Sequence, residues 1–185
     1  VDLVEEQIRI ARNLPISFKQ EDLQIKGHAI ELRVYAEDPL NDFLPSVGTL
    51  EVYKRPAGEN IRLDDGYEEG MDIPIYYDPM ISKLITYGDT REAAIQRMIE
   101  AIQLYEIEGV ATTLPFGTFV CQHEAFTSGK FDTHFVKNYF TPAALEQQSK
   151  EEAAIAAQIG LRLLMENRQQ LKSYKIEETA WFKNR

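Results

Sequence analysis

The residues best suited to chemistry in this sequence lie on one predicted strand, residues 27–36. Apolar and polar side chains alternate there, and the apolar set expected on one face is Ile30, Leu32 and Val34. Period-two alternation is typical of a strand with one buried face. The other face then carries Glu31 and Arg33. A guanidinium mounted on a rigid strand can be aimed well at a planar oxyanion.

Two interpretations of this pair stay open on the pattern alone. Glu31 and Arg33 could form an ordinary ion pair on a solvent-exposed sheet face, where such pairs are common and weak. Alternatively, Arg33 binds an anion through its fork of N–H donors. The cluster from Tyr76 to Asp78 is equally ambiguous, because its final Asp-Pro step is typical of a turn. Lys83 stands in an apolar stretch, where we expect it to pair with a carboxylate.

Other common catalytic patterns are absent from the sequence. It contains no glycine-rich phosphate loop, no GxSxG nucleophile turn and no HExxH zinc motif. The three histidines, His28, His123 and His134, are scattered, so we expect structural roles for them and no metal site. The single cysteine, Cys121, excludes an internal disulfide and fits a reducing cytoplasm.

Composition and charge narrow the class of protein further. The chain has 185 residues, 44% hydrophobic and 27% charged, as in ordinary globular domains. Its net charge of -10 argues against nucleic-acid or membrane partners, so an anionic substrate requires locally placed cations. We find no apolar run of membrane-spanning length and no signal peptide, and we expect a cytoplasmic protein. The chain opens at Val1 without a methionine, which we interpret as a segment of a longer protein.

Strand patterns come before helix patterns, which predicts an α+β fold: an antiparallel sheet packed with helices, plus a C-terminal helical extension. The expected elements are a packing helix capped by Asp2, a central strand over 81–87, a helix capped by Asp89, a single helix over 113–126, an extended and then irregular stretch over 131–140, and one long helix or a helix pair within 141–172.

Several motifs, taken in order, resemble the biotin carboxylase C-terminal domain. They are Gly27-His-Ala-Ile-Glu-x-Arg33, Ala36-Glu-Asp38, Phe43-Leu-Pro-Ser-x-Gly48, Tyr76-Tyr-Asp-x-Met-Ile-x-Lys-Leu-Ile85, Arg91-Glu-Ala-Ala-Ile-x-Arg-Met98, Ile107-Glu-Gly-Val-x-Thr-Thr113 and Phe131-Asp-Thr-His-Phe135. Each is weak alone, but together they are highly specific. The resemblance marks residues 1–140 as the domain. Residues 141–185 loosely resemble the helical linker that follows it in longer acyl-CoA carboxylase subunits.

The resemblance implies an ATP-dependent ligase of the acetyl-CoA, propionyl-CoA, methylcrotonyl-CoA or pyruvate carboxylases. In such enzymes ATP and Mg activate bicarbonate as carboxyphosphate, and biotin on a carrier protein is carboxylated at its ureido nitrogen. The arginine of the first motif, Arg33 here, sits in the family beside bicarbonate and the biotin ureido oxygen. Cations are needed where such negative charge develops. The resemblance therefore gives Arg33 the catalytic role.

Five further positions take weaker roles from the family. Glu31 and Asp78 are expected near bicarbonate and biotin. Thr133 and His134 match positions that border the adenine pocket. Arg62 matches a position at the dimer interface, which implies a homodimer.

Two residues depart from the family pattern. Tyr35 stands where many relatives have Asn, which changes the hydrogen bonding expected around Arg33. Glu59 stands where some relatives carry an apolar interface residue, which bears on the dimer. Each departure lies beside a position whose role is inferred from the family.

The rest of the catalytic machinery precedes this segment in the family: the metal-binding glutamates, the ATP lysines, the glycine-rich lid and the catalytic base. We therefore expect the isolated chain to bind no cofactor and to be inactive. ATP, Mg and carrier-bound biotin would belong to the full enzyme. The expected partners are the N-terminal ATP-grasp part of the same chain, a biotin carrier domain and a carboxyltransferase component, which chooses the acceptor.

Two other functions stay open from the sequence. The chain could be a non-catalytic module for dimerisation and docking, acting through Arg62 and the helix within 141–172. It could also be a CO2-binding or anion-binding domain of another ligase.

Overall fold

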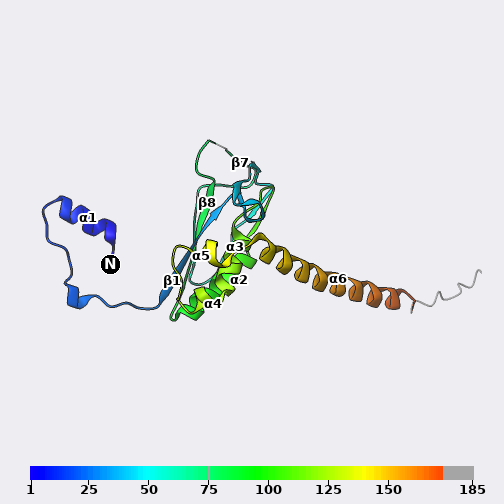
Figure 1. Cartoon of the computed structure of the whole chain (residues 1–185). Coiled ribbons are helices and arrows are strands. Elements are labelled where there is room, and N and C mark those ends of the chain that lie inside the picture. The colour runs from blue at the N-terminus through cyan, green and yellow to red at the C-terminus, as the bar shows by residue number, and fades with distance from the viewer. Residues whose placement is uncertain (75, 173–185) are drawn as a thin grey trace, which may run out of the picture.

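The computed structural model describes residues 1–74 and 76–172, and a three-stranded antiparallel sheet lies at its centre (Figure 1). Strand β8 (Met80–Gly88) is the middle strand, between β1 (His28–Tyr35) and β6 (Ile61–Asp65). Its largely apolar sequence is consistent with a central strand. The predicted central strand and the α+β class are both confirmed.

The register between β1 and β8 decides which side chains share a face. Arg33 lies opposite Lys83 and Leu32 lies opposite Leu84, and the register shifts between Val34 and Tyr35. Along β1 the residues Ile30 and Val34 are buried, whereas Glu31 and Arg33 are exposed. The predicted alternation of β1 is therefore confirmed.

Helix α2 (Arg91–Gln103) packs on the apolar face of this sheet. Its inward side chains are buried with those of β1 and β8 in one hydrophobic core: Ala94, Ile95, Met98, Ala101 and Ile102. The helix begins one residue later than predicted. Thr90, not Asp89, is the N-cap, because its Oγ1 accepts a hydrogen bond from the Ala93 N–H at 3.2 Å.

The predicted single helix over 113–126 is wrong, because the chain breaks at His123. It forms α3 (Leu114–Gln122) and α4 (Glu124–Thr127), and His123 has extended backbone with ψ 135°. The His123 Nδ1 accepts a hydrogen bond from the Ala125 N–H at 3.1 Å and so caps α4. This satisfies the imidazole in a structural role, as predicted for the histidines.

The stretch predicted as extended and irregular over 131–140 instead contains a short helix, α5 (Phe135–Tyr139). Ring centroids of Phe135 and Tyr139 lie 5.2 Å and 4.7 Å from that of His123. A helix of five residues is too short to be stable alone in water. Tertiary aromatic packing therefore decides the conformation of this stretch.

Smaller elements complete the body of the fold. Three antiparallel pairs join β2 (Glu37–Asp38) to β3 (Leu44–Pro45), β4 (Gly48–Thr49) to β7 (Asp72–Ile73), and β5 (Val52–Lys54) to β9 (Glu106–Glu108), and two 3-10 helices cover Gln20–Asp22 (η1) and Pro39–Asn41 (η2). A buried hydroxyl chain links distant parts: the Tyr53 and Tyr105 hydroxyl oxygens are 2.6 Å apart, and Tyr105 reaches Ser82 Oγ at 2.9 Å. Burial raises the pKa of both phenols, so they act as neutral hydrogen-bonding groups.

The two ends of the described chain lie outside this body (Figure 1). Helix α1 (Leu3–Ala11) is capped by Asp2 as predicted, but its Val4 and Ile8 are 65% and 50% exposed, so the predicted packing does not occur here. Helix α6 (Pro142–Lys172) is one helix, which resolves the predicted alternatives, and it touches the body at η2 and α3. None of the described helices combines the length and apolarity needed to cross a bilayer.

We predict that Gly88→Ala destabilises the fold where β8 meets α2. A Cβ at Gly88 would lie 2.5 Å from the Ala94 backbone nitrogen and 2.9 Å from the Ala93 carbonyl carbon, so the strand and the helix would have to separate. Overpacking of this kind costs about 1–3 kcal/mol of unfolding free energy, measured by urea denaturation. Gly66→Ala is the matched control, because nothing lies within 4 Å of its Cβ position. Equal stability of the two variants would contradict the prediction.

Candidate functional site

The polar face of the central sheet, opposite the core, carries the candidate site. In register across the three strands, Arg33 on β1 lies opposite Lys83 on β8, which lies opposite Asp64 on β6. The adjacent row places Glu31 and Arg62 on either side of Ile85. Directly opposed residues in antiparallel strands have Cβ atoms about 5 Å apart. The fold thus gathers charged side chains from residues 31–83 onto one surface.

Arg33 forms the ion pair that the sequence allowed and stays accessible. Its Nε lies 3.2 Å from Glu31 Oε1, and its side chain is 60% exposed. The pKa of Arg33 is raised above its ordinary value, first by the hydrogen bond to Glu31 and next by one to Tyr35. Tyr35, two residues along the same strand, thus adds to the effect of Glu31 on the pKa of the guanidinium. Arg33 is a permanent, solvent-facing cation.

Arg62 is held more firmly on the same face. Its Nε and Nη2 donate to the two carboxylate oxygens of Asp64, each at 2.9 Å. This pair lowers the pKa of Asp64, and the charge of Lys83 lowers it further. We expected Lys83 to pair with a carboxylate; it lies opposite Asp64, and its charge stabilises the ionised form of that side chain. Whereas Arg62 makes two hydrogen bonds to Asp64, Arg33 makes a single one to Glu31, from Nε to Oε1.

Asp78 lies just before β8, near the end of β1. Its Oδ1 accepts a hydrogen bond from the Met80 N–H at 3.0 Å, and Met80 pairs with Tyr35. Asp78 therefore performs the turn role that its sequence context allowed, and it does so at the Tyr35 end of the Arg33 strand. Burial, and after it the charge of nearby Asp78, raises the pKa of a second carboxyl group, that of Glu37.

One buried residue far along the chain supports the end of β1. Thr113 is 5% exposed, and its Oγ1 accepts a hydrogen bond from the Tyr35 N–H at 3.0 Å. The same hydroxyl donates to the Arg33 carbonyl oxygen at 3.2 Å. The Thr113 N–H also donates to the Tyr35 carbonyl oxygen at 3.1 Å. Together these bonds attach the start of α3 to the strand that carries Arg33.

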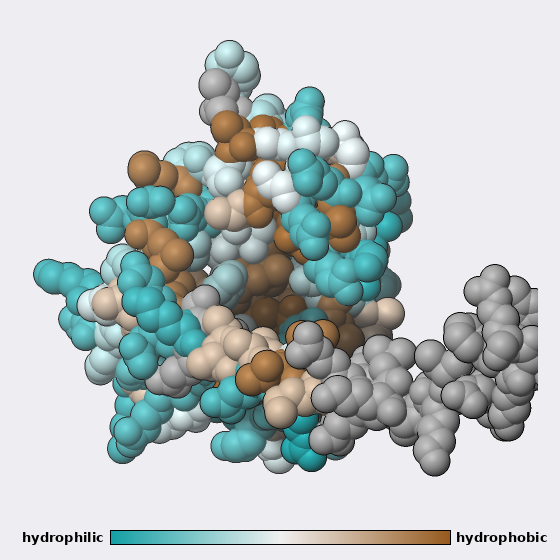
Figure 2. All heavy atoms as spheres, turned by 90° about the vertical axis from the view of Figure 1, so that its right-hand side faces the viewer, coloured by the Kyte–Doolittle hydropathy of each residue, from teal (hydrophilic) through white to brown (hydrophobic). Residues whose placement is uncertain are grey.

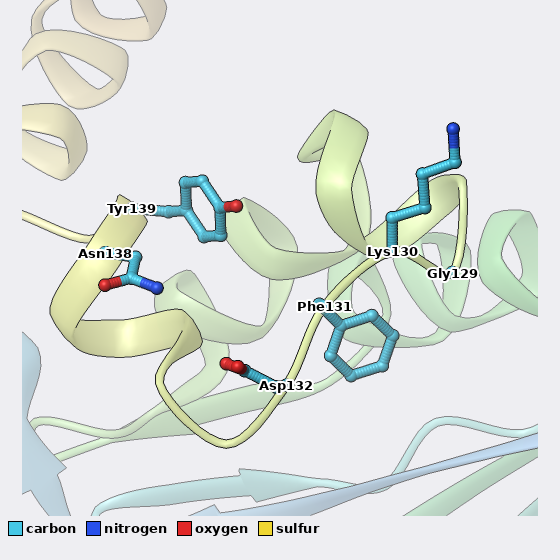
Figure 3. Close-up of a pocket in the computed structure, with 6 residues that line it drawn as sticks. All are labelled: Gly129, Lys130, Phe131, Asp132, Asn138 and Tyr139. Atoms are coloured by element: carbon cyan, nitrogen blue, oxygen red, sulfur yellow. The ribbon is translucent and has the colours of Figure 1, made fainter.

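The predicted nucleotide-side residues lie elsewhere, in the turn between α4 and α5. Thr133 and His134 are exposed, and the His134 N–H donates to Asp132 Oδ1 at 2.8 Å. Beside them is a shallow hollow of about 360 Å³, lined by Gly129, Lys130, Phe131, Asp132, Asn138 and Tyr139 (Figure 3). The hydrogen bonds and ion pairs of the described residues do not join this turn to Arg33 or Glu31.

Metal and thiol chemistry find little support in this part of the molecule. Among residues 1–74 and 76–172, no group of three or more His, Cys, Asp or Glu side chains could hold a metal ion. Burial raises the pKa of the Cys121 thiol to about 11. Because the thiolate is the nucleophilic form, Cys121 is inert at neutral pH. The polar sheet face remains the best candidate site.

The comparisons with known proteins place the chain in a family. The family model of the biotin carboxylase C-terminal domain matches residues 31–138. The chain belongs to this family. It is 46% identical over 138 residues to biotin carboxylase 1 of Bacillus subtilis and 48% identical over 137 residues to the biotin carboxylase of Haemophilus influenzae.

A solved structure shows the same fold. It is the biotin carboxylase domain dimer of Hydrogenobacter thermophilus 2-oxoglutarate carboxylase, in complex with MgADP, ADP and bicarbonate. It matches with a TM-score of 0.70 and 41% sequence identity, over 75% of this chain and 31% of that chain. The two bacterial relatives are matched over 75% and 74% of this chain, which spans 31% and 30% of their own lengths. The chain thus corresponds to about a third of each relative.

Thr113 is one of the residues at this site that sequence reasoning did not single out. Its contacts join positions 78 and 80 residues apart, which local patterns do not reveal. The available signal was its place at the end of the motif from Ile107 to Thr113.

We predict that Glu37→Gln stabilises the fold at neutral pH. Burial, followed by the charge of Asp78, raises the pKa of Glu37, so ionising this carboxyl destabilises the folded state increasingly as the pH rises through that pKa. The gain in stability should appear at pH 7 and vanish below about pH 4, where the glutamate at position 37 is protonated and as neutral as the glutamine that replaces it. Urea denaturation across this range measures it. Glu21→Gln, on an exposed 3-10 helix, is the control, and a gain independent of pH would contradict the prediction.

Proposed function

We propose that this chain is the C-terminal part of a biotin carboxylase and forms one wall of the site where ATP and bicarbonate carboxylate biotin on a carrier protein. The observation that carries the proposal is Arg33: an exposed, permanent cation on a rigid strand, in a motif of the matched family. Arg33 would hold bicarbonate and stabilise the negative charge that develops on the biotin ureido oxygen. Preorganised cations of this kind lower a reaction barrier.

The neighbouring residues receive supporting roles in this proposal. Glu31 orients the guanidinium through its contact to Nε, and Asp78 lies at the same end of the sheet. Thr133 and His134 would border the adenine of ATP, beside the hollow at the turn between α4 and α5. The sheet face fits an oxyanion, because it carries the exposed guanidinium of Arg33 beside the half-buried Lys83.

The cofactors would be held mainly by the rest of the enzyme. ATP and Mg would be bound by an N-terminal ATP-grasp part, and biotin would arrive on its carrier domain. We propose that the isolated chain is inactive for this reason. The domain would end near residue 140, shortly after the family match ends, and the extension over 141–185 would begin with α6, of which the structure describes residues up to 172.

We predict that Arg33→Ala in the full-length enzyme lowers the rate of biotin carboxylation by about 10²–10³-fold, as for loss of an oxyanion-stabilising donor. Arg33→Lys keeps the charge but loses the planar fork, so its rate should be intermediate. The measurement is ADP release with free biotin and bicarbonate. Lys54→Ala is the control, because Lys54 is an exposed cation paired with Glu106 in another sheet. A wild-type rate for Arg33→Ala would refute the proposal.

A second candidate function, as an assembly module, is favoured by exposed apolar surface on α6. Helix α6 exposes a set of apolar side chains: Ile155, Ile159, Leu161, Leu163, Leu164 and Met165. Seen from the side from which α6 leaves, the surface also shows apolar atoms lining a hollow (Figure 2). Exposed apolar surface of this kind marks sites of protein association. A carboxyltransferase component or a biotin carrier would be suitable partners.

The dimer part of this role rests on Arg62, an exposed residue on β6, and on the dimer in the matched solved structure. We predict that Arg62→Glu in the full-length protein raises the dimer dissociation constant about tenfold or more, because a charge reversal at an interface costs over 1.4 kcal/mol. Sedimentation velocity measures it. Lys54→Glu, the same reversal away from that strand, should leave the dimer intact. Equal effects of both variants would argue against Arg62 at the interface.

A further inference from the structure

Thr113 is a polar residue that the core buries almost completely. It sits where α3 begins, against the outer edge of β1, and β1 is itself an edge strand of the three-stranded sheet. Backbone groups on the outer edge of such a strand lack a neighbouring strand to pair with. Here the backbone groups of Arg33 and Tyr35 on this edge form hydrogen bonds with the hydroxyl and the N–H of Thr113.

The hydroxyl of Thr113 is diverted from its usual task. Thr113 is the N-cap of α3, where a threonine side chain normally accepts a hydrogen bond from the first turn of the helix. In this chain the Thr113 side chain makes no capping bond to α3. The hydroxyl oxygen accepts a hydrogen bond from the Tyr35 N–H, and the hydroxyl donates one to the Arg33 carbonyl oxygen. Both hydrogen bonds of the hydroxyl are therefore made to the strand.

The hydrogen bonds of Thr113 lie where the pairing of β1 with β8 is irregular. The register of β1 against β8 shifts between Val34 and Tyr35, one residue beyond Arg33, and Ile81 of β8 is the residue left without a partner on β1. A bulge of this kind leaves one residue unpaired and locally disrupts the ladder that holds the end of β1. The Thr113 bonds to the Arg33 carbonyl and to the Tyr35 N–H span this irregular step. They therefore fix the backbone direction from which the Arg33 side chain departs.

We propose that Thr113 is a positioning residue for Arg33: its hydroxyl locks the bulge that follows the arginine and so aims the guanidinium at the bound anion. This inference rests on the proposed function. Thr113 itself is buried and acts through the strand. Because misplacing a catalytic group by about 1 Å can lower a rate about 100-fold, a small shift of the backbone between Arg33 and Tyr35 is sufficient to impair catalysis.

The test is a double-mutant cycle in the full-length enzyme. Thr113→Val keeps the shape and removes the hydroxyl, and should lower kcat/KM for bicarbonate about 10- to 100-fold. Thr113→Ser restores the hydroxyl and should recover most of the activity. In an Arg33→Ala background, Thr113→Val should change the residual rate by less than about twofold, because the residue it positions is already gone.

The outcomes separate the two hypotheses. If Arg33→Ala lowers the rate as predicted and Thr113→Val either retains full activity or lowers the rate equally with and without Arg33, the positioning role is overturned and the proposed function stands. If Arg33→Ala retains full activity, the proposed function itself fails. Circular dichroism confirms that each variant is folded. Should Thr113→Val not fold, Thr113→Ala replaces it in the same cycle, since its smaller side chain leaves space for a water.

Discussion

The candidate site depends on the register between β1 and β8. With Arg33 opposite Lys83, the polar residues of β1 face away from α2 and the apolar ones face it. Because side chains alternate along a strand, a slip of one residue would turn the arginine into the core. Val34 and Leu84 are fully buried, and exposing either would return apolar area to water. The hydrophobic core therefore determines where a charged group points.

The same sheet face holds two arginines in different electrostatic states. Asp64 binds Arg62 at two points, whereas Glu31 contacts Arg33 through Nε. An exposed contact of the second kind contributes little to stability, so an incoming oxyanion can share or replace it. In a chain of net charge -10, such a cation can serve an anionic ligand only if the carboxylates of the chain hold it loosely. The arrangement leaves Arg33 available and keeps Arg62 occupied within the monomer.

Local patterns were enough to predict two strands of the central sheet, because the alternation in β1 and the apolarity of β8 are properties of consecutive residues. They failed at His123, where the flanking residues favour a helix and contacts to Phe135 and Tyr139 break it. The charged face followed from alternation alone. The role of Arg33 did not, since an exposed Glu–Arg pair is usually structural. That role came from the family motif, and Thr113 could be found only once the fold brought it to β1.

The contact between Thr113 and β1 also has a consequence for the order of folding. It closes loops of 78 and 80 residues, and the pairing of β1 with β8 already spans about 50. Contacts of such long range carry a loop-closure entropy and form slowly. During synthesis, the arginine strand emerges well before the segment that immobilises its outer edge. Until α3 has been made, β1 remains an edge that other chains could pair with, so this half of the domain is the part for which a nascent chain most needs protection.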